Sequence, residues 1–152
     1  MTKGLHNVLS KVLVTGAAGF IGSAVVRALN GQGTPVVALD ALLDGLYPAK
    51  EKIARFDFLT TFDGVDTFQL DLRSDDLSVL PRDIEYVINE AAMPGLGLSW
   101  TAFDLYSSCN LSALSRLIEA SNAWDLTKFI QISTSSVYGK SAVGDENQEI
   151  RP

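Results

Sequence analysis

The hydrophobic and polar positions of this chain alternate between two kinds of segment. Short apolar runs rich in β-branched residues predict strands, and longer segments with apolar residues at every third or fourth position predict helices. The predicted strands are Lys11–Thr15, Val36–Leu39, Thr67–Leu70, Tyr86–Asn89 and Phe129–Ser133. The predicted helices are Phe20–Asn30, Asp75–Leu80 and Thr101–Asn122, with a further short one at Ala49–Arg55 in the least regular stretch, residues 41–64.

This order of elements defines the expected fold class. Several of the strand segments are apolar at nearly every position, which is typical of strands buried on both faces. Strands that alternate with helices predict an α/β fold with a doubly wound parallel sheet of about five strands and right-handed crossovers. A chain of 152 residues is long enough for one domain with a sizeable core, so we expect a single domain over residues 1–152.

Composition and charge narrow the class of partner. The chain is 47% hydrophobic and 20% charged, as expected of a soluble globular protein. Its formal net charge is −6 and no Lys/Arg cluster stands out, which argues against a nucleic-acid partner. No apolar run has the length of a membrane span, and residues 1–10 lack the apolar core of a secretory signal. We therefore expect a cytoplasmic protein with no membrane partner.

The cysteine content adds little chemistry. Cys109 is the one cysteine in the sequence, so no disulfide can form within the chain. It falls within a predicted helix and is interpreted as a small buried or half-buried residue rather than a nucleophile. No metal site is expected.

A glycine-rich turn follows the first predicted strand. Gly-Ala-Ala-Gly-Phe-Ile-Gly occupies positions 16–22, between that strand and the first predicted helix. In such a turn the first glycine allows a sharp bend, the middle one admits a phosphate to the backbone, and the third allows close packing of the helix. The backbone N–H groups of Phe20 and Ile21 begin a helix and would point at an anion. A dinucleotide site is favoured over a turn that merely uses glycine.

Asp40 ends the second predicted strand. In a nucleotide-binding βαβ unit, an acidic residue at this place accepts hydrogen bonds from the adenosine ribose hydroxyls. Its charge would repel a 2′-phosphate, and no Lys or Arg follows within the next few residues. This favours NAD over NADP as the cofactor. The alternative is an Asp that caps a turn at the end of a strand.

Further candidate positions follow the remaining strands, at the edge where open α/β sheets bind ligands. Asp71 could face an adenine amino group and Leu72 could cover the ring, although an Asp after a strand is commonly a turn residue. Ala91 and Ala92 suit either a close cofactor or tight packing. A hydroxyl-rich segment, residues 133–139, reads Ser-Thr-Ser-Ser-Val-Tyr-Gly and could bind a substrate hydroxyl or form a turn.

Taken together, these residues resemble the extended short-chain dehydrogenase/reductase family, and within it the NAD-dependent nucleotide-sugar epimerases and dehydratases. The resemblance runs from about Lys11 to Pro152 and implies a Rossmann-like fold. It implies that the cofactor is bound by Gly16, Gly19, Phe20, Ile21, Gly22, Asp40, Asp71, Leu72, Ala91 and Ala92. It also implies that Asn110 organises water and backbone at the catalytic centre and that the hydroxyl of Thr134 binds the sugar oxygen undergoing oxidation.

The sequence departs from the family pattern in two places. Glu90 precedes the two alanines, where the family has an apolar residue. The general base of the family is a Tyr followed by Lys four positions later, and this chain contains no Tyr-x-x-x-Lys; Ala142 stands at that offset from Tyr138. The resemblance therefore implies an N-terminal part of a longer enzyme, cut before the later strands and the substrate domain.

The function expected from the resemblance is NAD binding within an enzyme that acts on a nucleotide sugar by transient hydride transfer. The family commonly forms dimers, so a homo-oligomer is expected. Without the Tyr-x-x-x-Lys pair, this chain is expected to be inactive alone. Two alternatives remain at this point: a binding module that senses NAD without turnover, and an interaction protein that keeps the fold with a vestigial site.

Overall fold

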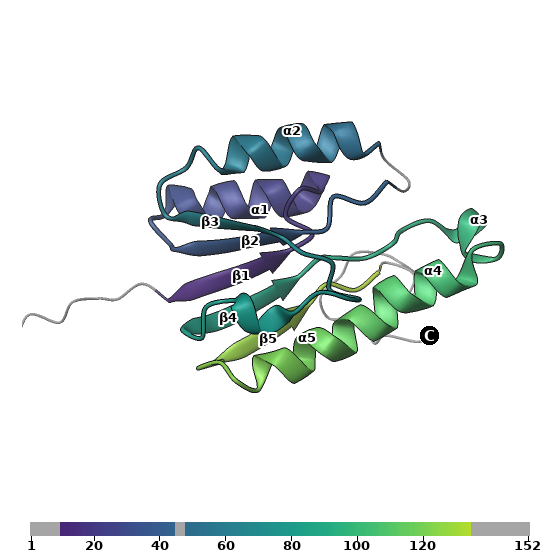
Figure 1. Ribbon diagram of the computed structural model, residues 1–152. Helices are drawn as coiled ribbons and strands as arrows, with labels where there is room; N and C mark the ends of the chain where they lie inside the picture. Colours follow the sequence, from purple (N-terminus) through teal and green to yellow (C-terminus); the bar gives the residue numbers. More distant parts are fainter. Residues whose placement is uncertain (1–9, 45–47, 135–152) are drawn as a thin grey trace, which may run out of the picture.

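The computed structural model describes residues 10–44 and 48–134. Five parallel strands form one sheet in the order β3-β2-β1-β4-β5, which is the first five strands of the doubly wound nucleotide-binding order (Figure 1). The strands are β1 (Lys11–Thr15), β2 (Val36–Asp40), β3 (Val65–Gln69), β4 (Ile84–Asn89) and β5 (Lys128–Gln131). The expected fold class is confirmed.

Helices cover both faces of this sheet. Helices α1 (Phe20–Gly31) and α2 (Ala49–Leu59) lie on one face, and a long helical segment lies on the other (Figure 1). That segment consists of α4 (Phe103–Ser107), a π-helical turn η2 (Ser108–Ser112) and α5 (Ala113–Ser121). Two shorter elements, a 3₁₀ turn η1 (Leu77–Val79) and α3 (Leu96–Ser99), complete the described part of the chain.

Alternation along the central strands divides the core into two layers. In β1, Leu13 packs with Leu117 of α5, while Val12 and Val14 pack with Val26 of α1 on the opposite face. Successive side chains of a strand point to opposite faces, so a strand buried on both sides must be apolar throughout. All five residues of β2 are buried for this reason.

The register of the strands places their carboxyl ends at one edge. Thr15 of β1 pairs with Leu39 of β2 and with Asn89 of β4, so the segments that follow these three strands begin side by side. Thr15 and Asn89 are also joined through their side chains by a buried hydrogen bond. The strand order reverses between β1 and β4, which is where this architecture opens a crevice.

Several predicted boundaries are corrected by the structure. The helix predicted at Asp75–Leu80 is only the 3₁₀ turn η1, because the Asp76 carboxylate accepts a hydrogen bond from the Ser78 N–H at 2.9 Å and Pro81 follows. The helix expected over Thr101–Asn122 begins at Phe103 and contains the π turn. Helix α3 was not predicted.

Smaller differences affect the remaining elements. Helix α2 is longer than the expected Ala49–Arg55, β3 and β4 begin two residues earlier than predicted, and β5 ends at Gln131. Strand β3 lies at the sheet edge and exposes Asp66 and Gln69, so it lacks the continuous apolar pattern of a strand buried on both faces. No helix in the described part of the chain has the length and apolar character needed to cross a bilayer.

Candidate cofactor site

A cleft of about 550 Å³ opens at the carboxyl edge of the sheet. It is lined by the turn after β1, the beginnings of the segments that follow β2, β3 and β4, one side of α2, and two residues of the long helical segment. All ten predicted cofactor-binding residues contribute to its lining: Gly16, Gly19, Phe20, Ile21, Gly22, Asp40, Asp71, Leu72, Ala91 and Ala92.

The glycine turn has little room for side chains. Gly16 has a φ of 66°, and a Cβ placed on it would lie 2.9 Å from the backbone nitrogen of Ala91. A Cβ on Gly22 would clash with the carbonyl oxygen of Gly16, while one on Gly19 would approach that oxygen to 3.0 Å. The third glycine was expected to let the helix pack on the sheet; its close contact is with the first glycine of the turn instead.

The N-terminus of α1 opens into this cleft. Gly19 is the N-cap residue and offers no side chain to the first turn. In the described part of the chain the backbone N–H groups of Phe20 and Ile21 have no acceptor, while the N–H of Ser23, one turn further on, donates to the Gly19 carbonyl. Free N–H groups and the helix dipole make this position suitable for an anion.

Asp40 supports the turn from the end of β2. Its side chain is buried, one oxygen accepts a hydrogen bond from the Ala18 N–H at 3.0 Å, and the other accepts from the Leu42 N–H at 2.8 Å. Each carboxylate oxygen can accept two hydrogen bonds, so the pair retains acceptor capacity toward the cleft. The turn-capping alternative therefore describes part of what Asp40 does.

Two basic side chains that the sequence pattern did not single out also line the cleft, from α2. Lys52 donates to the Leu43 carbonyl at 2.9 Å, and Arg55 donates to the Ala18 carbonyl at 3.2 Å. The preference for NAD over NADP took into account only the few residues after Asp40, which contain no Lys or Arg. Helical spacing could have flagged these side chains, since the three-residue interval between them places both on one face of α2.

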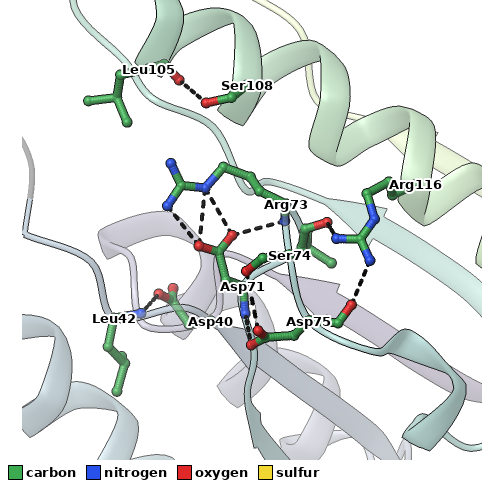
Figure 2. Close-up of polar contacts among 10 residues, drawn as sticks. Asp40, Leu42, Asp71, Arg73, Ser74, Asp75, Leu105, Ser108 and Arg116 are labelled. Carbon is green, nitrogen blue, oxygen red and sulfur yellow. Dashed lines mark hydrogen bonds and ion pairs between the residues drawn. The ribbon is translucent and has the colours of Figure 1, made fainter.

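Asp71 is held in an ion pair with Arg73. The guanidinium donates from Nε to both carboxylate oxygens, at 3.0 and 3.1 Å, and from a terminal nitrogen at 2.7 Å (Figure 2). The Arg73 N–H adds a further bond at 2.9 Å. These hydrogen bonds hold the pKa of Asp71 below its ordinary value. Leu72, the residue between them, is buried in the core layer beneath α5 as well as lining the cleft.

Arg116 of α5 also holds the segment that follows β3. Its guanidinium donates to the carbonyl oxygens of Leu72 at 2.9 Å and Asp75 at 2.7 Å (Figure 2). The segment after β3 is therefore held by the Asp71–Arg73 ion pair within it and by Arg116 from α5. This leaves the Asp71 carboxylate heavily engaged by protein donors.

The segment after β4 is positioned by side chains from two other elements. Thr15 accepts a hydrogen bond from the Ala91 N–H at 3.1 Å. Asn110, in the π turn, accepts from the Met93 N–H at 2.7 Å and donates to the Met93 carbonyl at 3.1 Å. The family resemblance implies that Asn110 organises water and backbone at the catalytic centre; in the structure its side chain holds the backbone of Met93. A π turn commonly marks a functional position in a helix.

The two expected catalytic residues lie apart from the cleft lining. Asn110 does not line the cleft itself, but its side chain is hydrogen-bonded to the backbone of Met93, which does. Thr134 follows β5, is exposed, and is not among the described residues that line the cleft. The rest of the hydroxyl-rich segment, residues 135–139, and the Val-Tyr-Gly sequence in it lie outside the described residues.

The fold and this site together define a dinucleotide-binding domain of the Rossmann type. The model of the NAD dependent epimerase/dehydratase family matches residues 12–152, so the chain belongs to that family. The family resemblance inferred from the sequence is thereby confirmed. NAD, the expected cofactor, is the one for which the family is named.

Individual relatives agree with this assignment. An uncharacterised UDP-glucose epimerase of Bacillus subtilis is 34% identical over 145 residues, covering 93% of this chain and 46% of the relative. A dTDP-glucose 4,6-dehydratase of Streptomyces griseus is 32% identical over 151 residues, covering 93% and 43%. This chain therefore spans less than half the length of these relatives.

Solved structures give the same picture. The UDP-glucuronic acid 4-epimerase of Bacillus cereus, crystallised with UDP-glucuronic acid and NAD, is 40% identical and superposes with a TM-score of 0.82. The superposition covers 93% of this chain and 46% of that one. The likeness therefore extends over the fold as well as the sequence.

Proposed function

We propose that this chain is the NAD-binding part of a nucleotide-sugar epimerase or dehydratase that works by transient hydride transfer. The observation that carries the proposal is the glycine turn, with the free N–H groups of Phe20 and Ile21 opening into the cleft beside Asp40. Such a turn binds the pyrophosphate of a dinucleotide. A similar protein crystallised with NAD supports the assignment of NAD as the cofactor.

Each part of the cofactor has a proposed place. The pyrophosphate lies against the turn Gly16–Gly22, the adenosine ribose against Asp40, and the adenine over Asp71 and Leu72. Ala91 and Ala92 border the channel toward the reacting end. Bound NAD would accept a hydride from a sugar carbon and later return it.

The polar residues near the reacting end have roles that the fold supports. Asn110 fixes the backbone of Met93 through two hydrogen bonds and so shapes the wall of the channel. Thr134, just beyond β5, would bind the sugar oxygen through its hydroxyl. Proton removal from that oxygen requires a base, and the sequence offers no Tyr-x-x-x-Lys pair for it. A nucleotide sugar is the proposed substrate of the complete enzyme.

A calorimetric titration with NAD tests the cofactor assignment directly. Gly19→Ala retains an allowed backbone conformation but places a methyl group 3.0 Å from the Gly16 carbonyl, at the proposed pyrophosphate seat. We expect it to bind NAD at least about tenfold more weakly than the unaltered chain. Gly31→Ala, at the other end of α1, is the matched control, because a Cβ there meets nothing within 4 Å.

Thermal unfolding shows whether a loss of NAD binding comes from the glycine turn or from a general loss of structure. Thermal unfolding of both variants should show cooperative transitions, and Gly31→Ala should bind NAD as the unaltered chain does. An unaltered chain that binds no NAD would overturn the proposal. Equal affinities for all three proteins would show that the glycine turn is not where NAD binds.

A further inference from the structure

Glu90 differs from the other acidic residues of the cleft. Asp40 accepts two backbone N–H groups, Asp71 is paired with Arg73, and Glu51 is paired with Arg55. Glu90 lines the same cleft, is half-buried, and has no hydrogen-bond or ion-pair partner among the described residues. Burial raises the pKa of its carboxyl. A half-buried carboxylate without donors is costly for the fold, which makes it a candidate for contact with a ligand.

The position of Glu90 indicates which part of a ligand it would meet. Strand β1 lies between β2 and β4; Asp40 ends β2, and Glu90 directly follows β4. The glycine turn lies between these two acids, since a Cβ on Gly16 would lie 3.0 Å from the carbonyl carbon of Glu90. Two carboxylates therefore flank the place proposed for the pyrophosphate.

A dinucleotide has a ribose on each side of its pyrophosphate. Asp40 is proposed to hold the adenosine ribose on the β2 side, so the second ribose extends toward β4 and Glu90. An ionised carboxylate accepts hydrogen bonds but cannot donate them, and its charge repels phosphate oxygens. On that side of the pyrophosphate, the hydroxyls of the second ribose are hydrogen-bond donors that an ionised carboxylate could accept.

We propose that Glu90 binds the nicotinamide ribose of NAD, with its carboxylate accepting hydrogen bonds from the ribose hydroxyls. This inference rests on the proposed NAD function and extends it. Because the usual family pattern has an apolar residue at this position, the contact would be a departure from that pattern. Glu90 would act by positioning the nicotinamide half of the cofactor against the wall formed by Ala91 and Ala92.

Three ligands that share an ADP group test this proposal, because NAD and ADP-ribose carry the second ribose and ADP does not. Calorimetry would compare NAD, ADP-ribose and ADP in the unaltered chain, Glu90→Leu, Glu90→Gln and the control Glu119→Leu. Glu119 is exposed on α5 and lies outside the cleft lining. We expect Glu90→Leu to weaken NAD and ADP-ribose about tenfold, the loss typical of one charge-assisted hydrogen bond, and to leave ADP within about twofold. Glu119→Leu should match the unaltered chain for all three ligands.

Each other result contradicts the proposal in a different way. Unchanged or tighter NAD binding by Glu90→Leu would overturn it, and an equal loss for ADP would mean that the substitution disturbs the whole cleft. Tighter ADP binding would mean that Glu90 faces the pyrophosphate. If Glu90→Leu fails to fold in thermal unfolding, Glu90→Gln, which keeps the side-chain size, decides the question by the same comparison, with about a threefold loss for NAD expected.

The same titrations distinguish failure of the wider proposal. An unaltered chain that binds neither ADP nor NAD would overturn the NAD function and this inference together. If the unaltered chain binds NAD and Glu90→Leu binds it equally well, this inference alone is overturned.

Discussion

The Asp40 carboxylate and the Ala18 backbone N–H are 3.0 Å apart and join the end of β2 to the middle of the glycine turn. The other oxygen of Asp40 holds the N–H of Leu42, whose φ of 54° lies in the left-handed region. One buried side chain therefore fixes the turn and the start of the segment that follows β2. The residue proposed to bind the adenosine ribose also supports the glycine turn.

Replacing Asp40 with Ala should weaken NAD binding about tenfold and relax discrimination against NADP. The substitution removes the proposed acceptor for the ribose and a negative charge that would repel a 2′-phosphate, and Lys52 and Arg55 already line the cleft. Calorimetric titration of both cofactors measures this. Asp66→Ala is the control, since Asp66 is exposed on β3 outside the cleft lining. If the unaltered chain binds NADP as tightly as NAD, the role given to Asp40 is wrong.

Replacing Asn110 with Ala should lower the free energy of unfolding by about 1–3 kcal/mol, because the Met93 N–H and carbonyl lose their partner. Urea denaturation followed by circular dichroism measures the change. Asn122→Ala, at the exposed end of the same helical segment, should change stability by less than about 0.5 kcal/mol. Equal stabilities of the two variants would mean that the Asn110 contact contributes nothing measurable.

The ion pair of Asp71 with Arg73 predicts a specific acid dependence of stability. Because the pKa of Asp71 is lowered in the folded chain, the unfolded chain binds protons more readily. The stabilising contribution of Asp71 is therefore complete well above about pH 4, the ordinary value for Asp, and is lost as pH falls through the lowered pKa. Asp71→Asn should destabilise the chain at pH 7 and should cost progressively less below about pH 4.

Urea unfolding of the unaltered chain, Asp71→Asn and the control Asp66→Asn over this pH range measures that dependence. The difference in unfolding free energy between the unaltered chain and Asp71→Asn should shrink toward low pH, and the control shows what the loss of an exposed carboxyl does under the same conditions. A difference for Asp71→Asn that does not vary with pH would show that the ion pair does not set the titration of Asp71.

The 152-residue chain should show no epimerase, dehydratase or dehydrogenase turnover with any nucleotide sugar. Thr134 can orient a hydroxyl, but an ordinary Tyr has a pKa of about 10 and none in this sequence has a Lys four positions later. General-base assistance alone is worth about a hundredfold to ten-thousandfold in rate. Assays with NAD and UDP- or dTDP-sugars test this, and robust turnover by the purified chain would contradict it.

Local patterns in the sequence were enough to specify the framework of this protein. Apolar runs predict that β1 and β2 are buried on both faces, and alternation with helices predicts the parallel, doubly wound arrangement. The glycine turn and Asp40 were also identified, because their chemistry depends on a few neighbouring residues and on their place after a strand. Burial of every β2 residue and the φ of Gly16 agree with those expectations.

Tertiary structure decided which polar groups remain available in the cleft. Arg73 and Asp71 are near in sequence, yet only the fold shows that their pairing occupies the expected adenine-binding carboxylate while Glu90 keeps no partner in the described chain. Lys52 and Arg55 enter the cleft because α2 packs beside α1. Asn110 meets Met93 because the fold brings the π turn next to the segment that follows β4. The energy of a hydrogen bond or ion pair depends on distance in space, which the order of residues along the chain does not specify.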